Sequence, residues 1–183
     1  NFINYFKKLN IKFEYINSKY CLTENDLKYF FTEKRNGYIQ LSRGIKAASK
    51  NIGEIYMLDK IDFKNEDIII DVGANIGILS TYFYFNKIQT NYFGIEPSPQ
   101  EFNDLKNNVK IFQKNFKLYE CAAGNKNEKE ISFNIDSVGG DSSLIFDNIN
   151  KVIKVKLIQL NTFQNMKIKF IKLECEGAEP EAL

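Results

Sequence analysis

The chain has 183 residues, enough for one domain, and its 44% hydrophobic residues with 16 Phe and 10 Tyr exclude a disordered protein. The net charge of +2 provides no strong field for a polyanion, so we expect no nucleic-acid partner. The sequence has no histidine, which excludes a histidine base, and no apolar run of the ~20 residues that cross a membrane, so we expect no membrane association.

The cysteines Cys21, Cys121 and Cys175 are widely spaced, and no pair has the Cys-x-x-Cys spacing. This pattern is neither a disulfide framework nor a zinc site. We therefore expect reduced thiols, a cytoplasmic protein and no metal site.

Residues 1–64 have a mixed pattern, and we predict an N-terminal extension that packs on the domain after it. Within it, TENDLKYFFTEKR at residues 23–35 begins with a possible capping residue, Thr23, and predicts a helix. EIYMLDKI at residues 54–61 predicts another short helix.

Residues 65–183 predict one α/β domain. The apolar run at residues 67–71 is typical of a strand buried on both faces of a parallel sheet. Residues 91–96 and 116–122 predict two more strands, and the segments between the three strands have helical spacing. This alternation predicts a doubly wound α/β sheet.

The second of these helices has a clear start signal. Ser98 can cap it, Pro99 suits its first position and Glu101 can close a capping box. Apolar residues at helical spacing predict the buried faces of the two helices: Ile76, Leu79 and Phe83 in the first, and Phe102, Leu105, Val109 and Phe112 in the second.

The last third of the chain predicts further strands. Residues 131–135 and 151–160 alternate with period two and predict antiparallel or edge strands, with the turn-like DSVGGDSS between them. We expect Lys154 and Lys156 on a solvated face. Residues 168–174 predict a last strand, parallel to the first buried strand and beside it. Its uncovered edge would allow self-association.

The stretch IIIDVGANIGILS at residues 68–80 carries the strongest functional signal. The predicted strand ends at Asp71, Gly73 permits a sharp turn, and Gly77 permits close approach of the next helix. Ligands of open α/β sheets bind at such carboxyl ends of strands. We expect the backbone N–H groups that open the helix to face the ligand: those of Ala74, Asn75 and Ile76.

A second carboxylate, Glu96, ends the next predicted strand. Its two acceptor oxygens suit the two hydroxyl donors of a ribose. The G-x-x-x-G spacing of Gly73 and Gly77 differs from the G-x-G-x-x-G of dinucleotide-binding proteins, and Asp71 would repel a phosphate but suit an ammonium group. S-adenosylmethionine has an ammonium, a ribose and an adenine without a phosphate, so we predict it as the cofactor.

Five stretches, IIIDVGANIG, FGIEPSPQEFNDLKNNV, CAAGN, DSSL and IKLECEGAE, together resemble the FkbM-type S-adenosylmethionine-dependent methyltransferases over roughly residues 53–183. The resemblance implies the Rossmann-like class I methyltransferase fold and O-methylation of a sugar, a glycan or a small natural product. The cofactor-binding residues that it implies are Asp71, Gly73, Ala74, Asn75, Gly77, Glu96, Pro97 and Ala122.

A hydroxyl acceptor must lose a proton, and without histidine the candidate bases are carboxylates, Lys or Tyr. In an alternating strand Lys172, Glu174 and Glu176 share one face, with Leu173 and Cys175 on the other. We predict Glu174 as the catalytic residue, helped by Glu176 and Lys172. The alternative is that Glu174 only pairs with Lys172 and that Glu176 belongs to a structural turn. Two carboxylates could also ligate a divalent cation, but they are too few to predict a metal site.

The sequence departs from the family at two positions, because the family usually has aspartate where this chain has Glu174 and Asn161. The family fold also continues after the position of Leu183, so we expect its C-terminal strands to be missing from this chain. Two other classes stay open. One is a cofactor-binding or interaction domain without turnover. The other is a nicotinamide-dependent oxidoreductase, which the glycine spacing disfavours.

Overall fold

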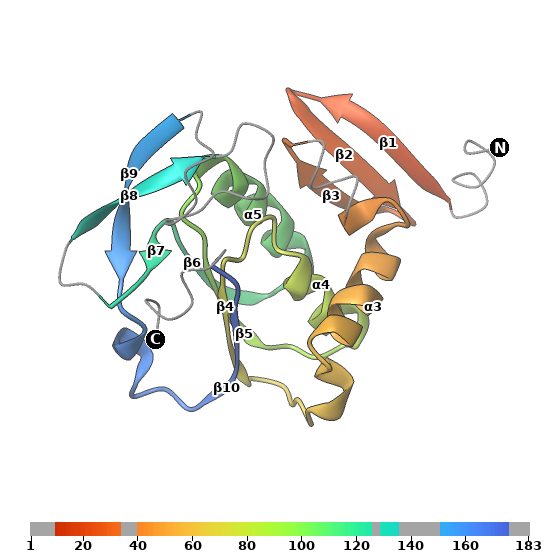
Figure 1. Cartoon of the computed structure of the whole chain (residues 1–183). Coiled ribbons are helices and arrows are strands. Elements are labelled where there is room, and N and C mark those ends of the chain that lie inside the picture. Colours follow the sequence, from red (N-terminus) through yellow and green to blue (C-terminus); the bar gives the residue numbers. More distant parts are fainter. Residues whose placement is uncertain (1–9, 34–39, 126–128, 136–150, 176–183) are drawn as a thin grey trace.

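The computed structural model describes residues 10–33, 40–125, 129–135 and 151–175. Its centre is a parallel four-stranded sheet in the order β10-β4-β5-β6 (Figure 1). The strands are β4 (Ile68–Val72), β5 (Asn91–Ile95), β6 (Asn115–Tyr119) and β10 (Ile168–Leu173). All three strands predicted between residues 67 and 122 are therefore present within a few residues of their expected bounds.

The strand order shows where the chain changes the side of the sheet on which it adds strands. The chain adds β5 and then β6 on one side of β4, and it later returns to place β10 on the other side. β10 is parallel to β4, with Lys172 opposite Asp71, which confirms the predicted pairing of the last strand. Such a reversal is the hallmark of a doubly wound sheet, and ligands bind at the carboxyl ends of the two strands that flank it.

Three helices cover one face of this sheet (Figure 1). They are α3 (Ile45–Ile55), α4 (Ile78–Phe85) and α5 (Pro99–Phe112), and a 3₁₀ turn, η1 (Leu58–Lys60), follows α3. The apolar residues predicted for the two helices of the domain are all buried: Ile76, Leu79, Phe83, Phe102, Leu105, Val109 and Phe112. The opposite face packs on Phe163 of a second 3₁₀ turn, η2 (Leu160–Phe163).

The antiparallel strands predicted after residue 130 form a small separate sheet. It contains β7 (Ala122–Ala123), β8 (Glu130–Ile135) and β9 (Lys151–Ile158), with β8 and β9 antiparallel. Lys154 and Lys156 are exposed on it, as predicted. The stretch DSVGGDSS lies outside the described residues.

The helix predicted at residues 23–35 is wrong, because this region belongs to an antiparallel sheet of β1 (Ile11–Ile16), β2 (Lys19–Glu24) and β3 (Leu27–Phe31). Asn25 and Asp26, with φ of 47° and 71°, form the two-residue turn between β2 and β3. Positive φ at both positions defines a type I′ turn, which Asn and Asp tolerate and which matches the twist of a hairpin. The helix predicted at residues 54–61 exists in part, since α3 begins earlier and ends within this stretch.

Asn108 of α5 connects the N-terminal sheet to the parallel sheet. Its side-chain oxygen accepts the Phe30 N–H at 2.7 Å, and its amide nitrogen donates to the carbonyls of Phe30 and Ile76 at 2.8 Å each. Asn108 is fully buried, and Tyr29 of β3 also donates to the Ile76 carbonyl at 2.7 Å. β3 is thus fixed to the turn that precedes α4.

We predict that Asn108→Leu lowers the free energy of unfolding by about 2–4 kcal/mol, because the N–H and carbonyl of Phe30 lose their side-chain partner and the Ile76 carbonyl loses one of its two donors. The matched control is Asn103→Leu, the same change at an exposed position of α5, which should alter stability by less than about 0.5 kcal/mol. Urea denaturation of both variants measures the difference. Equal stabilities would contradict the role given to Asn108.

Candidate cofactor and active site

Gly73 lies where β4 and β10 end side by side. Its φ is +70°, and a Cβ at this position would lie 1.8 Å from the carbonyl oxygen of Glu174. A side chain is therefore excluded both by the backbone conformation and by the neighbouring strand. Gly77 has φ +88°, and a Cβ there would lie 2.8 Å from Leu105 of α5, so this glycine permits the close helix packing predicted for it.

A buried ion pair links the same two strands. The Lys172 ammonium lies 2.9 Å from Asp71 Oδ1 and donates to the Gly73 carbonyl at 2.8 Å. The Tyr92 hydroxyl donates to the other oxygen of Asp71. The side chains of Lys172 and Asp71 are only 5% and 1% exposed. Asp71 is therefore paired with Lys172 and Tyr92 rather than open to the ammonium of a ligand, as the sequence had suggested.

The charge of Lys172 is fixed by its partners. Burial by itself lowers the pKa of Lys172. The carboxylates of Asp71 and Glu174 raise it by more than burial lowers it, so the pKa lies above its ordinary value. Lys172 thus stays an ammonium at physiological pH. It serves as a hydrogen-bond donor in this arrangement and is not available as a base.

Glu96 lies at the carboxyl end of β5 beside this turn. One of its oxygens accepts the Asn75 N–H at 2.8 Å and the other accepts the Ser98 N–H at 2.9 Å. Burial raises the pKa of Glu96 to about 7, with the Glu101 carboxylate adding to it and the two N–H groups opposing it. Each oxygen keeps a second acceptor position, so the carboxylate can still accept two hydroxyl groups.

These contacts explain why the capping box predicted for α5 does not form. The Ser98 N–H, which Glu101 would have accepted, is already bound to Glu96. The Ser98 hydroxyl instead donates to the Glu101 carboxylate, and no side-chain hydrogen bond caps the helix.

The three N–H groups expected to face a ligand are paired within the protein, so that expectation is wrong. Ala74 N–H donates to the Ile95 carbonyl at 3.0 Å, Asn75 N–H to Glu96, and Ile76 N–H to the Asn75 side chain at 2.8 Å. Buried N–H groups need partners, and the turn finds them by folding back on β5. Gly73 and Asn75 keep partly exposed surface at the turn.

Glu174 follows β10 at the same end of the sheet. Its N–H donates to the Val72 carbonyl at 3.2 Å, and its carboxylate lies 3.1 Å from the Lys172 ammonium. Its side chain is 56% exposed, so the group predicted as the base reaches solvent while Lys172 holds one of its oxygens. Leu173 and Cys175 pack on the opposite face, as the alternation predicted.

The other predicted site residues differ in how exposed they are. Pro97 is partly exposed next to Glu96, whereas Ala122 is buried in β7, where it pairs with Leu157. Asn161 is exposed in η2. Glu176 lies outside the described residues. One residue near Glu174 was missed by sequence reasoning: burial raises the pKa of Tyr56 above its ordinary value, the Glu174 carboxylate adds to this, and no spacing in the sequence indicates that the two are neighbours.

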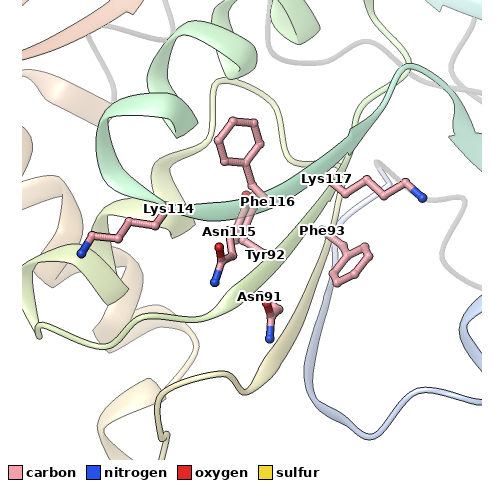
Figure 2. A pocket seen from close by; sticks show the side chains of 7 residues that line it. All are labelled: Asn91, Tyr92, Phe93, Lys114, Asn115, Phe116 and Lys117. Carbon is pink, nitrogen blue, oxygen red and sulfur yellow. The ribbon is translucent and has the colours of Figure 1, made fainter.

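A shallow hollow of about 370 Å³ lies elsewhere on the sheet. Figure 2 shows its lining residues, which come from the beginnings of β5 and β6 and the residue before β6: Asn91, Tyr92, Phe93, Lys114, Asn115, Phe116 and Lys117. Because β5 and β6 are parallel, this hollow lies at the amino ends of the strands, opposite the end that holds Glu96. We therefore assign it no part in cofactor binding.

Among the residues that the structure describes, no helix has both the length and the apolar character needed to cross a membrane.

Comparison with known proteins identifies the class as methyltransferase. Residues 71–183, well over half of the chain, match the sequence profile of the methyltransferase FkbM domain. The chain belongs to the FkbM methyltransferase family, whose methyl donor is S-adenosylmethionine. The doubly wound parallel sheet agrees with the Rossmann-like class I methyltransferase fold of that family.

Two solved structures are also similar to the chain. TYW2 of M. jannaschii, in complex with AdoMet, is 16% identical and aligns over 57% of this chain and 43% of its own, with a TM-score of 0.39. TYW2 of P. horikoshii, in complex with MeSAdo, is 20% identical over 58% of this chain and 37% of its own, also at 0.39. The chain thus spans less than half the length of either structure. No curated protein matches it significantly.

Proposed function

We propose that the protein transfers a methyl group from S-adenosylmethionine to a hydroxyl group of a sugar, a glycan or a small natural product. The observation that carries the proposal is the meeting of Glu96, the Gly73 turn and Glu174 at the carboxyl ends of three adjacent strands, in a chain of the FkbM family. The reversal of the sheet beside β4 is where this class of fold binds its ligand.

The residues at this end fit the cofactor. Glu96 would hold the ribose, because its two oxygens retain acceptor capacity and lie beside the turn. Gly73, Asn75 and Pro97 would line the binding surface, since they are the partly exposed residues next to Glu96. The buried residues Asp71, Ala74 and Gly77 would fix the conformation of the turn. Ala122 would be in the segment that flanks the adenine.

When bound, the cofactor supplies a methyl group that is already activated by its positive sulfur. The chain must then orient the acceptor hydroxyl, exclude water and take up its proton. Orientation alone can contribute up to about 7–11 kcal/mol in favourable cases. Glu174 is the exposed carboxylate at the end of β10, and it would take up the proton while the Lys172 ammonium, 3.1 Å away, orients it. Glu176 would assist it.

The cysteines and the edge of the sheet support proposals about the location and the self-association of the protein. The buried thiols of Cys21 and Cys121 suit a reducing compartment, and we propose a cytoplasmic location. In the described part of the chain β10 pairs only with β4, so its other edge offers a surface for self-association.

A labelled transfer assay tests the proposed reaction. The protein is incubated with methyl-tritiated S-adenosylmethionine and a glycan fraction from a cell extract, and the radioactivity in the glycans is counted. Incorporation above a boiled-protein control supports O-methylation. Binding of the cofactor without incorporation would instead favour a binding domain without turnover.

We predict that binding of 5′-methylthioadenosine, which lacks the amino-acid part, strengthens up to about tenfold between about pH 6 and pH 8. Because the pKa of Glu96 is raised to about 7, its carboxyl group is largely neutral below this pH and becomes the better acceptor for the ribose hydroxyls above it. Glu96→Gln should weaken binding at the higher pH by about ten- to a hundredfold and remove the pH dependence. Calorimetry measures both effects.

The control is Glu130→Gln, at an exposed position on β8, which should bind and titrate like the natural sequence. If Glu96→Gln kept the same affinity and the same pH dependence, the ribose assignment would be wrong.

We predict that Glu174→Gln lowers turnover by about 10²–10⁴-fold, the usual contribution of a general base, and leaves cofactor affinity nearly unchanged. Glu174→Asp, which keeps a carboxylate, should retain much of the turnover. The transfer assay and calorimetry measure the two quantities separately. Full turnover of Glu174→Gln would remove the base role and leave proximity as the source of catalysis.

A further inference from the structure

Tyr92 of β5 reaches along the parallel sheet toward the acceptor side of the site. Lys172, Asp71 and Gly94 lie opposite one another in β10, β4 and β5, so they form one row across three neighbouring strands. Tyr92 precedes Gly94 by two residues and therefore projects from the same face of β5. Its ring is fully buried in the apolar cluster between the sheet and the helices.

Gly94 leaves the space that the Tyr92 ring needs. A Cβ at Gly94 would lie 3.2 Å from Cε1 of Tyr92 and 2.9 Å from Cδ2 of Leu118. Because this position has no side chain, the ring passes it, and the Tyr92 hydroxyl donates to Oδ2 of Asp71, the residue opposite Gly94. Burial raises the pKa of Tyr92 well above its ordinary value, and Asp71 adds to this effect. The phenol thus keeps its proton and serves as a donor.

The Tyr92 hydroxyl and the Lys172 ammonium divide the two oxygens of Asp71 between them. Lys172 donates to Oδ1 at 2.9 Å, whereas Tyr92 donates to Oδ2. The same ammonium donates to the Gly73 carbonyl at 2.8 Å and lies 3.1 Å from a carboxylate oxygen of Glu174. Lys172 is therefore shared between a buried carboxylate, Asp71, and an exposed one, Glu174.

This sharing depends on the Tyr92 hydroxyl. A buried carboxylate oxygen that loses its donor is costly, and an ammonium has three protons to donate. Without the hydroxyl, the ammonium at Oδ1 would satisfy Oδ2 as well by moving toward the centre of the Asp71 carboxylate. Tyr92 approaches Asp71 from β5, whereas Glu174 follows β10 on the other side of β4. The movement would therefore take Lys172 away from Glu174.

We infer that Tyr92 is a positioning residue of the acceptor site: by satisfying one oxygen of Asp71, it leaves the Lys172 ammonium in contact with the Glu174 carboxylate. The inference rests on the proposed function of Glu174 as the group that takes the proton of the acceptor. Tyr92 is fully buried, so it does not touch the acceptor itself. It acts on the direction of the Glu174 carboxylate through Asp71 and Lys172.

Crystal structures of the full chain and of its Tyr92→Phe variant test this inference without cofactor or acceptor. The variant keeps the packed ring and removes only the hydroxyl. We expect the distance from Lys172 Nζ to the Glu174 carboxylate to increase from 3.1 Å to more than about 4 Å, the limit of an ion pair. The matched control is Tyr29→Phe, because Tyr29 is also fully buried but donates to the Ile76 carbonyl. This control should keep the contact between Lys172 and Glu174.

Methyl transfer separates positioning from a general effect on the fold. We expect Tyr92→Phe to lower turnover by about ten- to a hundredfold and to leave the affinity for S-adenosylmethionine nearly unchanged. The same substitution should cause no further loss in Glu174→Gln, because the carboxylate that it positions is already absent. A merely structural role would lower turnover by the same factor in both backgrounds. Tyr29→Phe should retain full turnover.

An unchanged distance in Tyr92→Phe, or an equal change in Tyr29→Phe, would overturn the inference. Equal losses of turnover with and without the Glu174 carboxylate would also overturn it. A failure of the proposed function gives a different result. In that case the distance would change in Tyr92→Phe, but Glu174→Gln would keep full turnover, which would retain the positioning of Glu174 and remove only its part in the reaction.

Discussion

The buried ion pair between Lys172 and Asp71 holds together the end of the sheet on which every functional assignment depends. It joins β10 to β4 across the reversal of strand order, and the same ammonium binds the Gly73 carbonyl, so strand pairing and turn conformation are fixed together. Two charges with exposures of 5% and 1% are costly to bury unless both are paired. Glu174 then extends from this pair toward solvent, and Glu96 approaches the turn from β5.

The cofactor side and the acceptor side of the proposed site use the turn differently. On the cofactor side the N–H groups of Gly73, Ala74 and Asn75 are not available to a ligand, because they already donate to β5 and to Glu96. Recognition of the ribose would therefore depend on the acceptor capacity of one buried carboxylate, whose raised pKa makes it sensitive to pH near neutrality. On the acceptor side the exposed Glu174 carboxylate pairs with the Lys172 ammonium beneath it.

Much of the parallel sheet could be predicted because its signals are local. The apolar run before Asp71 and the Ser98-Pro99 start of α5 each specify an element within a few residues. The hairpin at Asn25-Asp26 was missed because its turn residues also suit the start of a helix, and the pairing of β2 with β3 decided between the two. Lys172, the partner of Asp71, lies 101 residues away in the sequence. The sequence therefore shows both charged residues but does not indicate that they form a buried pair. Tyr56 follows α3 and packs against the apolar cluster that includes Phe63, and no motif in the sequence indicates this position.

A double-mutant cycle on Asp71 and Lys172 tests the central role of the ion pair most directly. Urea unfolding is measured for Asp71→Asn, Lys172→Met and the double variant. The account predicts a loss of about 3–5 kcal/mol in each single variant, because each leaves a buried charge without its partner. The double variant should lose clearly less than the sum, with a coupling of about 1–3 kcal/mol. Additive losses would show that the two residues stabilise the fold independently, and this would contradict the account.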